Sequence, residues 1–433
     1  MIIDFTVKNY LSFKEEQTIS FEATTDNTYS DIYTTQINKT KLLKFAVIYG
    51  ANASGKTNLL EAIDYLRNLQ INPPIDKSKS TKFIPFLLDE TSKNEKGFFK
   101  LSFFIGSKKY IYSIKLTDNI IFWEKLIYYP SNQQALLFER NFNPDKNISE
   151  LKYGEYLKLS NEDQIFLTKS TINNTTVLGT FAKSNIHSEH LDAIYKWFKN
   201  NVMQIIKSDT NLFNWSSKRI KESVENKNFL LDILKKADFN ISDIKFEEID
   251  IDLTEELVEQ IDKLPISEKK KQEIIEAKKI TPEQVLFIHD TTNNSYSIPK
   301  QLQSQGTIRY FGLAGALNKL INENSILLID ELENSLHYEL VRHFIKTFLV
   351  NSKNSQLIIS THDIGLLEDD LMRRDTIWIT QKNNNGSTEL YSVVDFKLHK
   401  NISIANAYKI GKLGGKPELG DIYLNNYEAN DKL

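Results

Sequence analysis

Hydrophobic and polar residues alternate with the period of a β-strand in several parts of the first 150 residues. Residues 2–7 and 18–21 predict short strands, and the apolar run 42–49 is long enough for one buried strand. This run leads into a glycine-containing loop and then into a segment with apolar residues at helical spacing. Residues 98–142 alternate around two short turns, which predicts an antiparallel β-subdomain.

The last third of the chain alternates segments of helical period with short apolar runs. It predicts helices at 308–321 and 338–349 and strands at 325–330, 356–360 and 375–380. Strands separated by helices are typical of a mostly parallel sheet with helices on its faces.

The segment from about residue 186 to 281 is highly charged and predicts helices. Pro265 divides its Glu- and Lys-rich stretch, 252–279, into two short helices. Charge runs most often form a solvated face, so the plain interpretation is a helical hairpin in solvent. The alternative is a shortened coiled-coil arm.

Composition narrows the possible functions. Of the 433 residues, 40% are hydrophobic and 26% are charged, and the formal net charge of −3 does not suit a basic nucleic-acid coat. The absence of cysteine excludes disulfides, thiolate metal sites and cysteine nucleophiles. No apolar run reaches about 18 residues, and residues 1–10 do not resemble a signal peptide, so we expect a cytoplasmic protein with no membrane contact.

A phosphate-binding loop is predicted between the strand at 42–49 and the helix that follows. Residues 50–57 match the pattern G-x-x-x-x-G-K-[ST], in which backbone N–H groups surround phosphates, the lysine reaches the β and γ oxygens, and the hydroxyl binds Mg²⁺. The alternative is a glycine-rich turn with an incidental Lys-Thr pair. The residues assigned to ATP here are Gly50, Asn52, Ala53, Ser54, Gly55, Lys56, Thr57 and Asn58.

Two consecutive acids end the apolar strand at 325–330. Burying carboxylates at a strand end is unfavourable unless they meet a cation, so Asp330 is predicted to bind Mg²⁺ together with Thr57. Glu331 is predicted to be the general base that polarises the attacking water. Two consecutive acids could also stand at the end of a strand with no catalytic role. Together with the phosphate-binding loop they indicate an ATPase.

Three further motifs indicate the class of ATPase. Ser304 and Gly306 lie just before a helix, about 25 residues before Asp330, where an ABC signature motif would present a hydroxyl and amides to a γ-phosphate. Residues 333–337 occupy the place of the D-loop. His362 follows the strand at 356–360, where a switch histidine belongs, although it could also be an ordinary strand-end histidine.

The order of these motifs predicts a split ATPase head that works as a dimer. The signature helix of an ABC head serves the nucleotide of a second protomer, so we expect composite sites in a homodimer or higher homo-oligomer. The predicted fold is α/β: a split ABC-ATPase head with a mixed, mostly parallel sheet, flanking helices, an antiparallel β-subdomain and an inserted helical region. The expected domains are an N-terminal lobe at 1–185, a helical insertion at 186–281 and a C-terminal lobe at 282–433.

One usual element of ABC heads has no clear counterpart. The segment at 83–89 contains no glutamine that could assist Mg²⁺ and the attacking water. Asp89 and Glu90 are the nearest polar candidates for that role.

With these motifs the chain resembles bacterial ABC ATPases related to RecF, SMC proteins and the ATPase half of OLD nucleases. More narrowly, it resembles the phage-resistance ATPases that include RloA, AbiL-type proteins and the AriA subunit of PARIS systems. The resemblance covers nearly the whole chain, including residues 5–13, Pro85-Phe86, residues 330–337 and the tail at 408–417. Gln303 stands where that family often has Glu, and the tail is also a variant.

The resemblance implies a function in defence against phage. It implies a sensor or scaffold ATPase that controls a separately encoded effector, commonly a toprim-type nuclease, with DNA or a phage protein as the trigger. The alternative is a RecF-like DNA-repair ATPase, and a transporter motor is a third, less suitable interpretation. The cations considered for a DNA track are Arg309, Lys319, Arg373, Arg374 and Lys269-Lys270-Lys271.

Overall fold

The structure is a computed structural model of the whole chain. It describes residues 1–254, 257–258, 267–277, 279–369, 372–399 and 402–417, so the predicted break at Pro265 lies outside the described residues. The chain forms two compact units. The first unit comprises Met1–Asp209, Lys319–Asn334 and Phe344–Leu433, and the second comprises Thr210–Asn318 and Ser335–His343.

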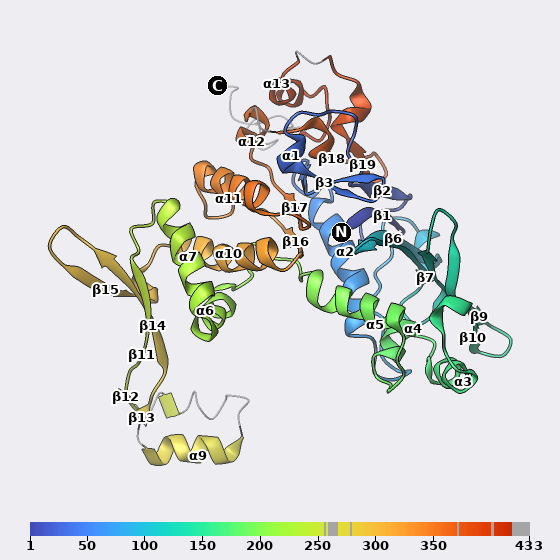
Figure 1. The fold of residues 1–433 in the computed structure, drawn as a ribbon, viewed down its shortest axis with the longest axis horizontal. Helices are drawn as coiled ribbons and strands as arrows, with labels where there is room; N and C mark the ends of the chain where they lie inside the picture. The colour runs from blue at the N-terminus through green and yellow to red at the C-terminus, as the bar shows by residue number, and fades with distance from the viewer. Residues whose placement is uncertain (255–256, 259–266, 278, 370–371, 400–401, 418–433) are drawn as a thin grey trace, which may run out of the picture. The chain divides into compact units, whose positions relative to one another are not determined.

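A five-stranded sheet in the first unit is built from segments far apart in the sequence. Its order is β16-β17-β5-β18-β19, and every neighbouring pair is parallel except the last (Figure 1). The predicted mostly parallel sheet is therefore confirmed. The strands are β5 (Phe45–Tyr49), β16 (Ile326–Ile329), β17 (Gln356–Ser360), β18 (Ile377–Lys382) and β19 (Thr388–Ser392).

The strands at 45–49 and 325–330 are not direct neighbours in the sheet. β17 lies between them, and Ile359 pairs with Val47 on one side and with Ile329 on the other. Because these strands are parallel, their carboxyl ends still meet at one edge of the sheet. The glycine-containing loop and the two acids therefore come together without direct strand pairing.

The apolar run at 42–49 also forms two strands rather than one. β4 (Thr40–Leu43) pairs with β3 (Thr34–Ile37), and β5 begins at Phe45. The break is at Lys44, whose buried ammonium donates hydrogen bonds to the carbonyl oxygens of Leu349 and Ser352, both at 2.8 Å. Burial lowers the pKa of Lys44 to about 8. A lysine inside an apolar run thus marks a turn between strands.

Residues 202–206 extend the five-stranded sheet beyond β16. Met203 and Ile206 donate backbone hydrogen bonds to the carbonyls of Ile326 and Leu328, and the Asp330 N–H donates to Ile206 at 2.8 Å. This segment lies within the range that we expected to be helical. Its apolar residues Val202, Ile205 and Ile206 are buried, which an extended edge segment explains better than a solvated helix.

The second sheet of this unit is the predicted antiparallel β-subdomain. Its seven strands have the order β10-β9-β8-β7-β6-β1-β2, and all neighbouring pairs are antiparallel. The strands are β1 (Ile2–Lys8), β2 (Gln17–Ser20), β6 (Gly97–Ile105), β7 (Lys108–Leu116), β8 (Ile121–Tyr129), β9 (Ala135–Asn143) and β10 (Ile148–Tyr153).

The main core of the unit joins both sheets to helix α2 (Lys56–Ile71). Phe5 and Leu101 from the antiparallel sheet, Leu59 and Leu66 from α2, and Ile358 from β17 belong to one buried cluster. The loop at the start of α2 is thereby fixed relative to both sheets. The other α-helices lying wholly in this unit are α1 (Ser30–Tyr33), α3 (Asn161–Ser170), α4 (Val177–Phe181), α5 (Glu189–Lys196), α12 (Gly365–Glu368) and α13 (Ile404–Lys409).

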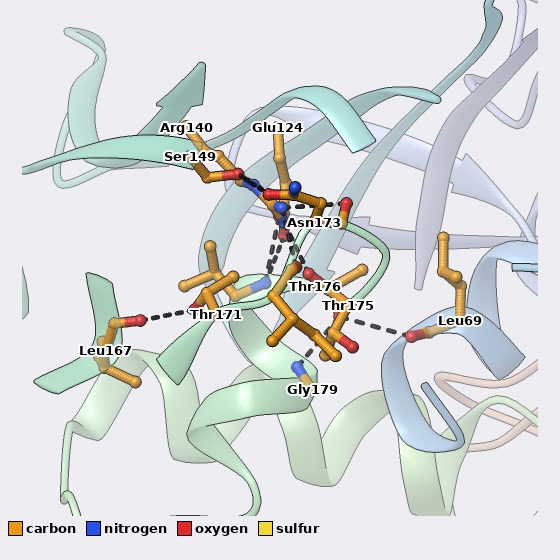
Figure 2. A network of polar contacts seen from close by, with 12 residues as sticks. Leu69, Glu124, Arg140, Ser149, Leu167, Thr171, Asn173, Thr175, Thr176 and Gly179 are labelled. Carbon is orange, nitrogen blue, oxygen red and sulfur yellow. Dashed lines mark hydrogen bonds and ion pairs between the residues drawn. The ribbon is translucent and has the colours of Figure 1, made fainter. Parts of the chain in front are cut away.

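A buried ion pair anchors the antiparallel sheet to the turn before α4. Arg140 on β9 lies 3.5 Å from Glu124 on β8, and both side chains are fully buried. The guanidinium also donates to the carbonyls of Ile172, Asn173 and Thr175, as part of the network in Figure 2. Burial raises the pKa of the Glu124 carboxyl, while Arg140 and the Val177 N–H act against that rise.

Arg140→Met should lower the free energy of unfolding by about 3–5 kcal/mol, because Glu124 and three carbonyls would lose their buried partner. Urea unfolding of the two proteins measures the difference. The matched control is Lys125→Met, which removes a partly exposed ion pair with Glu139. This change should lower the free energy of unfolding by roughly 0–1 kcal/mol. Equal losses in the two variants would contradict this role of Arg140.

The second unit combines helices with a three-stranded sheet. Helices α6 (Phe213–Glu222) and α7 (Val224–Lys236) lie in the segment that was expected to be helical. Asp243–Glu248, expected to be helical, instead forms β11 and pairs with β14 (Glu283–Asp290), which also pairs with β15 (Ser295–Pro299). Ile244 and Phe246 alternate with charged residues, so the strand period outweighs the high charge.

Five further helices and strands belong to the described fold. Strands β12 (Ile251–Asp252) and β13 (Lys279–Ile280) pair near helix α9 (Glu268–Ala277). Helices α10 (Gln305–Asn322) and α11 (Tyr338–Asn351) match the helices predicted in the last third, and each has residues in both units.

Candidate functional site

The glycine-containing loop connects the buried strand β5 to helix α2. Gly55 has φ +109°, a conformation that L side chains rarely adopt, and an added Cβ would lie 2.2 Å from the Thr388 hydroxyl oxygen. At Gly50 an added Cβ would lie 2.4 Å from the Ser54 hydroxyl oxygen. Both glycines are therefore required by the loop itself. Asn52 and Ala53 are exposed at its tip, and Ala53 has a positive φ of 61°.

The Lys56 ammonium folds back over this loop. Its Nζ donates to the carbonyl oxygens of Gly50 at 2.8 Å and Ala51 at 3.1 Å. Burial lowers the pKa of Lys56, and the nearby acids Asp330, Glu331 and Glu333 act against that shift. A buried cation held over a loop at a helix N-terminus suits a polyphosphate.

Thr57 and Asp330 meet at the same edge, although 273 positions separate them. The Thr57 hydroxyl donates to Asp330 Oδ2 at 2.9 Å, and the Ser360 hydroxyl donates to Asp330 Oδ1 at 2.5 Å. A hydroxyl and a carboxylate together are the hard oxygen ligands that Mg²⁺ prefers. This arrangement suits a magnesium ion that would bind between Thr57 and Asp330.

Glu331 follows Asp330 in an unusual backbone conformation. Its φ is +50°, and its N–H donates to the Ser360 hydroxyl at 2.9 Å. A positive φ at a non-glycine residue costs on the order of 1–3 kcal/mol and is often found at functional sites. Ser360 thus holds both acids, through the side chain of Asp330 and the backbone of Glu331.

His362 is held by an acid of the predicted D-loop. Glu333 Oε1 accepts the His362 N–H at 2.8 Å and lies 2.8 Å from the imidazole Nδ1. Glu333 Oε2 is buried and has no hydrogen-bond partner among the described residues. The His362 side chain remains 61% exposed at the end of β17, so it is oriented without being covered.

Several residues that support the loop were missed in the sequence. Ser54 shares a 2.6 Å hydrogen bond with Thr380 on β18, and Thr388 on β19 donates to the Ser54 carbonyl at 2.8 Å. Asn58 donates to Ser12 at 2.8 Å, and the Ser12 and Thr388 hydroxyls share a further hydrogen bond of 2.7 Å. Isolated Ser and Thr residues in strands carry no sequence signal, so only the sheet order reveals these contacts.

The tail of the chain also reaches the loop. An added Cβ at Gly415 would lie 3.5 Å from Gly50 Cα and 2.6 Å from Ile379. The Tyr408 hydroxyl donates to the Gly415 carbonyl at 2.9 Å, which closes this turn. The glycines in the quoted tail motif therefore allow close packing against the start of the loop.

The predicted signature residues lie in the second unit. The Ser304 hydroxyl accepts the Thr307 N–H at 3.1 Å, so Ser304 caps the N-terminus of α10. An added Cβ at Gly306 would lie 2.9 Å from the Ser335 carbonyl oxygen, which explains why glycine occupies this position. Ser304 is exposed.

Asp89 and Glu90 have local partners outside the loop at 50–57. Asp89 Oδ2 accepts hydrogen bonds from the Thr91 hydroxyl and from the Ser92 N–H and hydroxyl, and these bonds hold the pKa of Asp89 well below its usual range. Glu90 forms an ion pair with Lys93. Both acids therefore stabilise a local turn, and neither has a described contact with the loop at 50–57.

A cation that we did not predict lies near Asp330. Lys207 follows Ile206, which accepts the Asp330 N–H, and it forms an ion pair with Glu61 on α2. The hydrogen bond to Glu61 raises the pKa of Lys207, and the negative charge of Asp330 contributes. The segment at 202–207 therefore brings a cation close to Asp330 from the edge of the sheet.

Two arginines of the considered DNA track are occupied by structural contacts. Arg373 is buried, donates to the Thr28 carbonyl and pairs with Asp375 at 2.6 Å. Arg374 donates to the carbonyls of Leu398, His399 and Ile402. Including them in a DNA track was wrong. The side chains of Lys269 and Lys270 lie outside the described residues.

A family model described as "AAA domain, putative AbiEii toxin, Type IV TA system" matches residues 45–368. The chain belongs to this AAA-domain family. The match covers three-quarters of the chain and includes the loop, both acids and His362. A search of curated proteins found no match.

The AAA-domain chain is also similar to solved structures of SMC heads. The SMC head domain from Thermotoga maritima is 12% identical, covers 90% of this chain and 98% of its own, and has a TM-score of 0.42. An SmcHead bound to the C-winged helix domain of ScpA has 15% identity, coverages of 94% and 99%, and a TM-score of 0.38. A Pyrococcus furiosus Smc head with an extended coiled coil, bound to the C-terminal domain of ScpA, has 12% identity, coverages of 95% and 98%, and a TM-score of 0.38.

These identities and TM-scores are too low to say anything about function. The α/β class of this AAA-domain protein rests on its own sheets and flanking helices. Among the described residues, no helix is long and apolar enough to cross a membrane. The described part also contains no group of three or more His, Cys, Asp or Glu side chains that could hold a metal by themselves.

Proposed function

We propose that this protein is an ABC-type ATPase that binds and hydrolyses ATP with Mg²⁺. The observation that carries the proposal is the hydrogen bond between Thr57 and Asp330, which joins the phosphate-binding loop to the acidic strand end. Lys56 lies over the same loop, and Glu331 follows Asp330 directly. Membership of an AAA-domain family supports this proposal.

Each residue has a distinct proposed role. The loop amides and Lys56 bind and orient the β and γ phosphates, while Thr57 and Asp330 hold the metal, which supplies charge neutralisation at the phosphate oxygens when bound. Glu331 accepts a proton from the attacking water. His362, oriented by Glu333, contacts the γ-phosphate as it leaves. Lys207 keeps a positive charge near Asp330 through its pair with Glu61.

The proposed assembly is a homodimer around ATP. Ser304 and Gly306 at the start of α10 present a hydroxyl and backbone N–H groups, a suitable site for the γ-phosphate bound by a second copy. The support is that Ser304 is exposed at the start of this helix. Each site then takes its loop from one copy and its signature from the other.

We also propose that the ATPase acts in defence against phage, in the group that includes RloA and AriA. In this proposal it is the cytoplasmic sensor or scaffold that controls a separately encoded effector, a toprim-type nuclease. The support is the quoted motifs together with a family description that names AbiEii-type toxins. The RecF-like alternative is weakened because two of its candidate DNA contacts, Arg373 and Arg374, donate hydrogen bonds to backbone carbonyls of this chain.

Plaque counts on cells carrying the chain and its genomic neighbours test the defence proposal. Wild type should protect, whereas the Glu331→Gln variant should not, with normal growth in the absence of phage. Deleting only the neighbouring genes should also end protection. Full protection by the chain alone would contradict a separate effector.

A further inference from the structure

The face of the antiparallel sheet that points away from the core carries a row of alternating cations and aromatic rings. Lys8 on β1 pairs in register with Phe98 on β6, Phe98 pairs with Lys115 on β7, and Lys115 pairs with Trp123 on β8. Residues directly opposite each other in neighbouring strands lie on the same face. The four side chains therefore form one row across four strands.

Lys115 lies close to both rings of this row. The Lys115 ammonium lies 5.8 Å from the centroid of Phe98 and 5.6 Å from that of Trp123, so it lies between the two rings. Trp123 is fixed by a 3.0 Å hydrogen bond from its Nε1 to Glu139. Next to the row, Lys96 lies 4.1 Å from the centroid of Phe122. The rings are partly exposed and are held in defined positions.

A cavity of about 720 Å³ lies over this row, within the range of about 300–1,000 Å³ that is usual for ligand sites. Lys8, Lys96, Lys115, Phe98 and Trp123 line it. None of these lysines has a carboxylate within 4 Å among the described residues, although Glu16 and Glu95 also contribute to the lining. The next row on the same face adds Lys100 and Lys125, which pair with Asp4 and Glu139.

We propose that this face binds single-stranded nucleic acid. Partly exposed rings provide surfaces on which bases stack, and every base has such a face, so the site would tolerate different sequences. The lysines beside the rings neutralise the phosphates that connect stacked bases. A duplex, whose bases are already stacked, could use only the lysines.

The charge pattern favours this ligand over an acidic protein segment. An acidic peptide would use the lysines but would gain little from Phe98 and Trp123 at alternate positions of the row. A strand with a phosphate for every base needs both kinds of side chain. The site uses no residue of the phosphate-binding loop, so it can be tested separately from ATP hydrolysis.

Fluorescence anisotropy of the full-length protein with labelled oligo-dT and oligo-rU, at about 50 and 200 mM salt, tests the site. Trp123→Ala should weaken binding by about 5- to 150-fold, the usual loss per stacked base. Lys115→Glu should weaken binding and also make its salt dependence shallower, because one phosphate contact is lost. Binding of a DNA duplex of the same length should be weaker than that of the single strand.

Two matched variants control for general effects. Lys196→Glu changes an exposed lysine on α5, and Tyr296→Ala removes an exposed ring on β15. Both should bind the oligonucleotides as wild type does, and all four variants should retain ATP binding. Phe98→Leu keeps an apolar side chain in the sheet and should still weaken binding. Equal binding by wild type, Trp123→Ala and Phe98→Leu would overturn the proposal, as would full competition by polyglutamate.

Discussion

Replacing Glu331 with Gln should leave ATP binding unchanged and slow hydrolysis by about 100- to 10,000-fold, the usual contribution of a general base. The amide keeps the size of the side chain but cannot accept the proton from water. The backbone of residue 331 should remain in place, because its N–H donates to Ser360, whose hydroxyl also holds Asp330. Phosphate release under excess ATP measures the rate, and titration with labelled ATP measures binding.

The control for this substitution is Glu389→Gln, which changes an exposed acid on β19. It should hydrolyse ATP at the wild-type rate. Because Glu331→Gln traps the ATP state, it should also increase the fraction of dimer in the presence of ATP. Turnover at the wild-type rate would show that Glu331 is not the base, and His362 would become the next candidate.

Lys56→Ala should weaken the affinity for ATP by about 100-fold or more, because a charge-assisted contact to the phosphates is lost. The fold should survive, since within the described part of the chain Lys56 Nζ donates to the carbonyls of Gly50 and Ala51, which both belong to the loop. Equilibrium titration with labelled ATP measures the affinity. Lys183→Ala, an exposed lysine after α4, is the control. Wild-type affinity in Lys56→Ala would contradict the assignment of the loop.

The glycine-containing loop and the parallel strands could be predicted because their signals are local. A glycine pattern after an apolar strand indicates phosphate binding, and two acids at the end of another strand indicate metal binding. Both signals hold wherever the strands lie in the sheet. The sheet order could not be predicted in the same way. Nothing in the apolar run of β17 indicates that it lies between β5 and β16, because all three strands are equally buried.

Residues that act through another element were also missed. Ser360, Thr380 and Thr388 contact the loop or the acids only because β17, β18 and β19 bring them there. Lys207 was missed because its segment was assigned to a charged helical region, whereas it follows an extended edge segment. The assignment of Asp89 failed for the opposite reason: proximity in sequence suggested a role that a local turn explains better.

We propose that two copies of this chain share each ATP site. Mixing two inactive variants, Lys56→Ala and Ser304→Arg, tests it most directly. In a mixed dimer one site carries both changes and the other carries neither, so ATPase activity should return to at most about half of wild type, depending on the fraction of mixed dimers. No recovery in a sample in which native mass spectrometry shows mixed dimers would contradict composite sites.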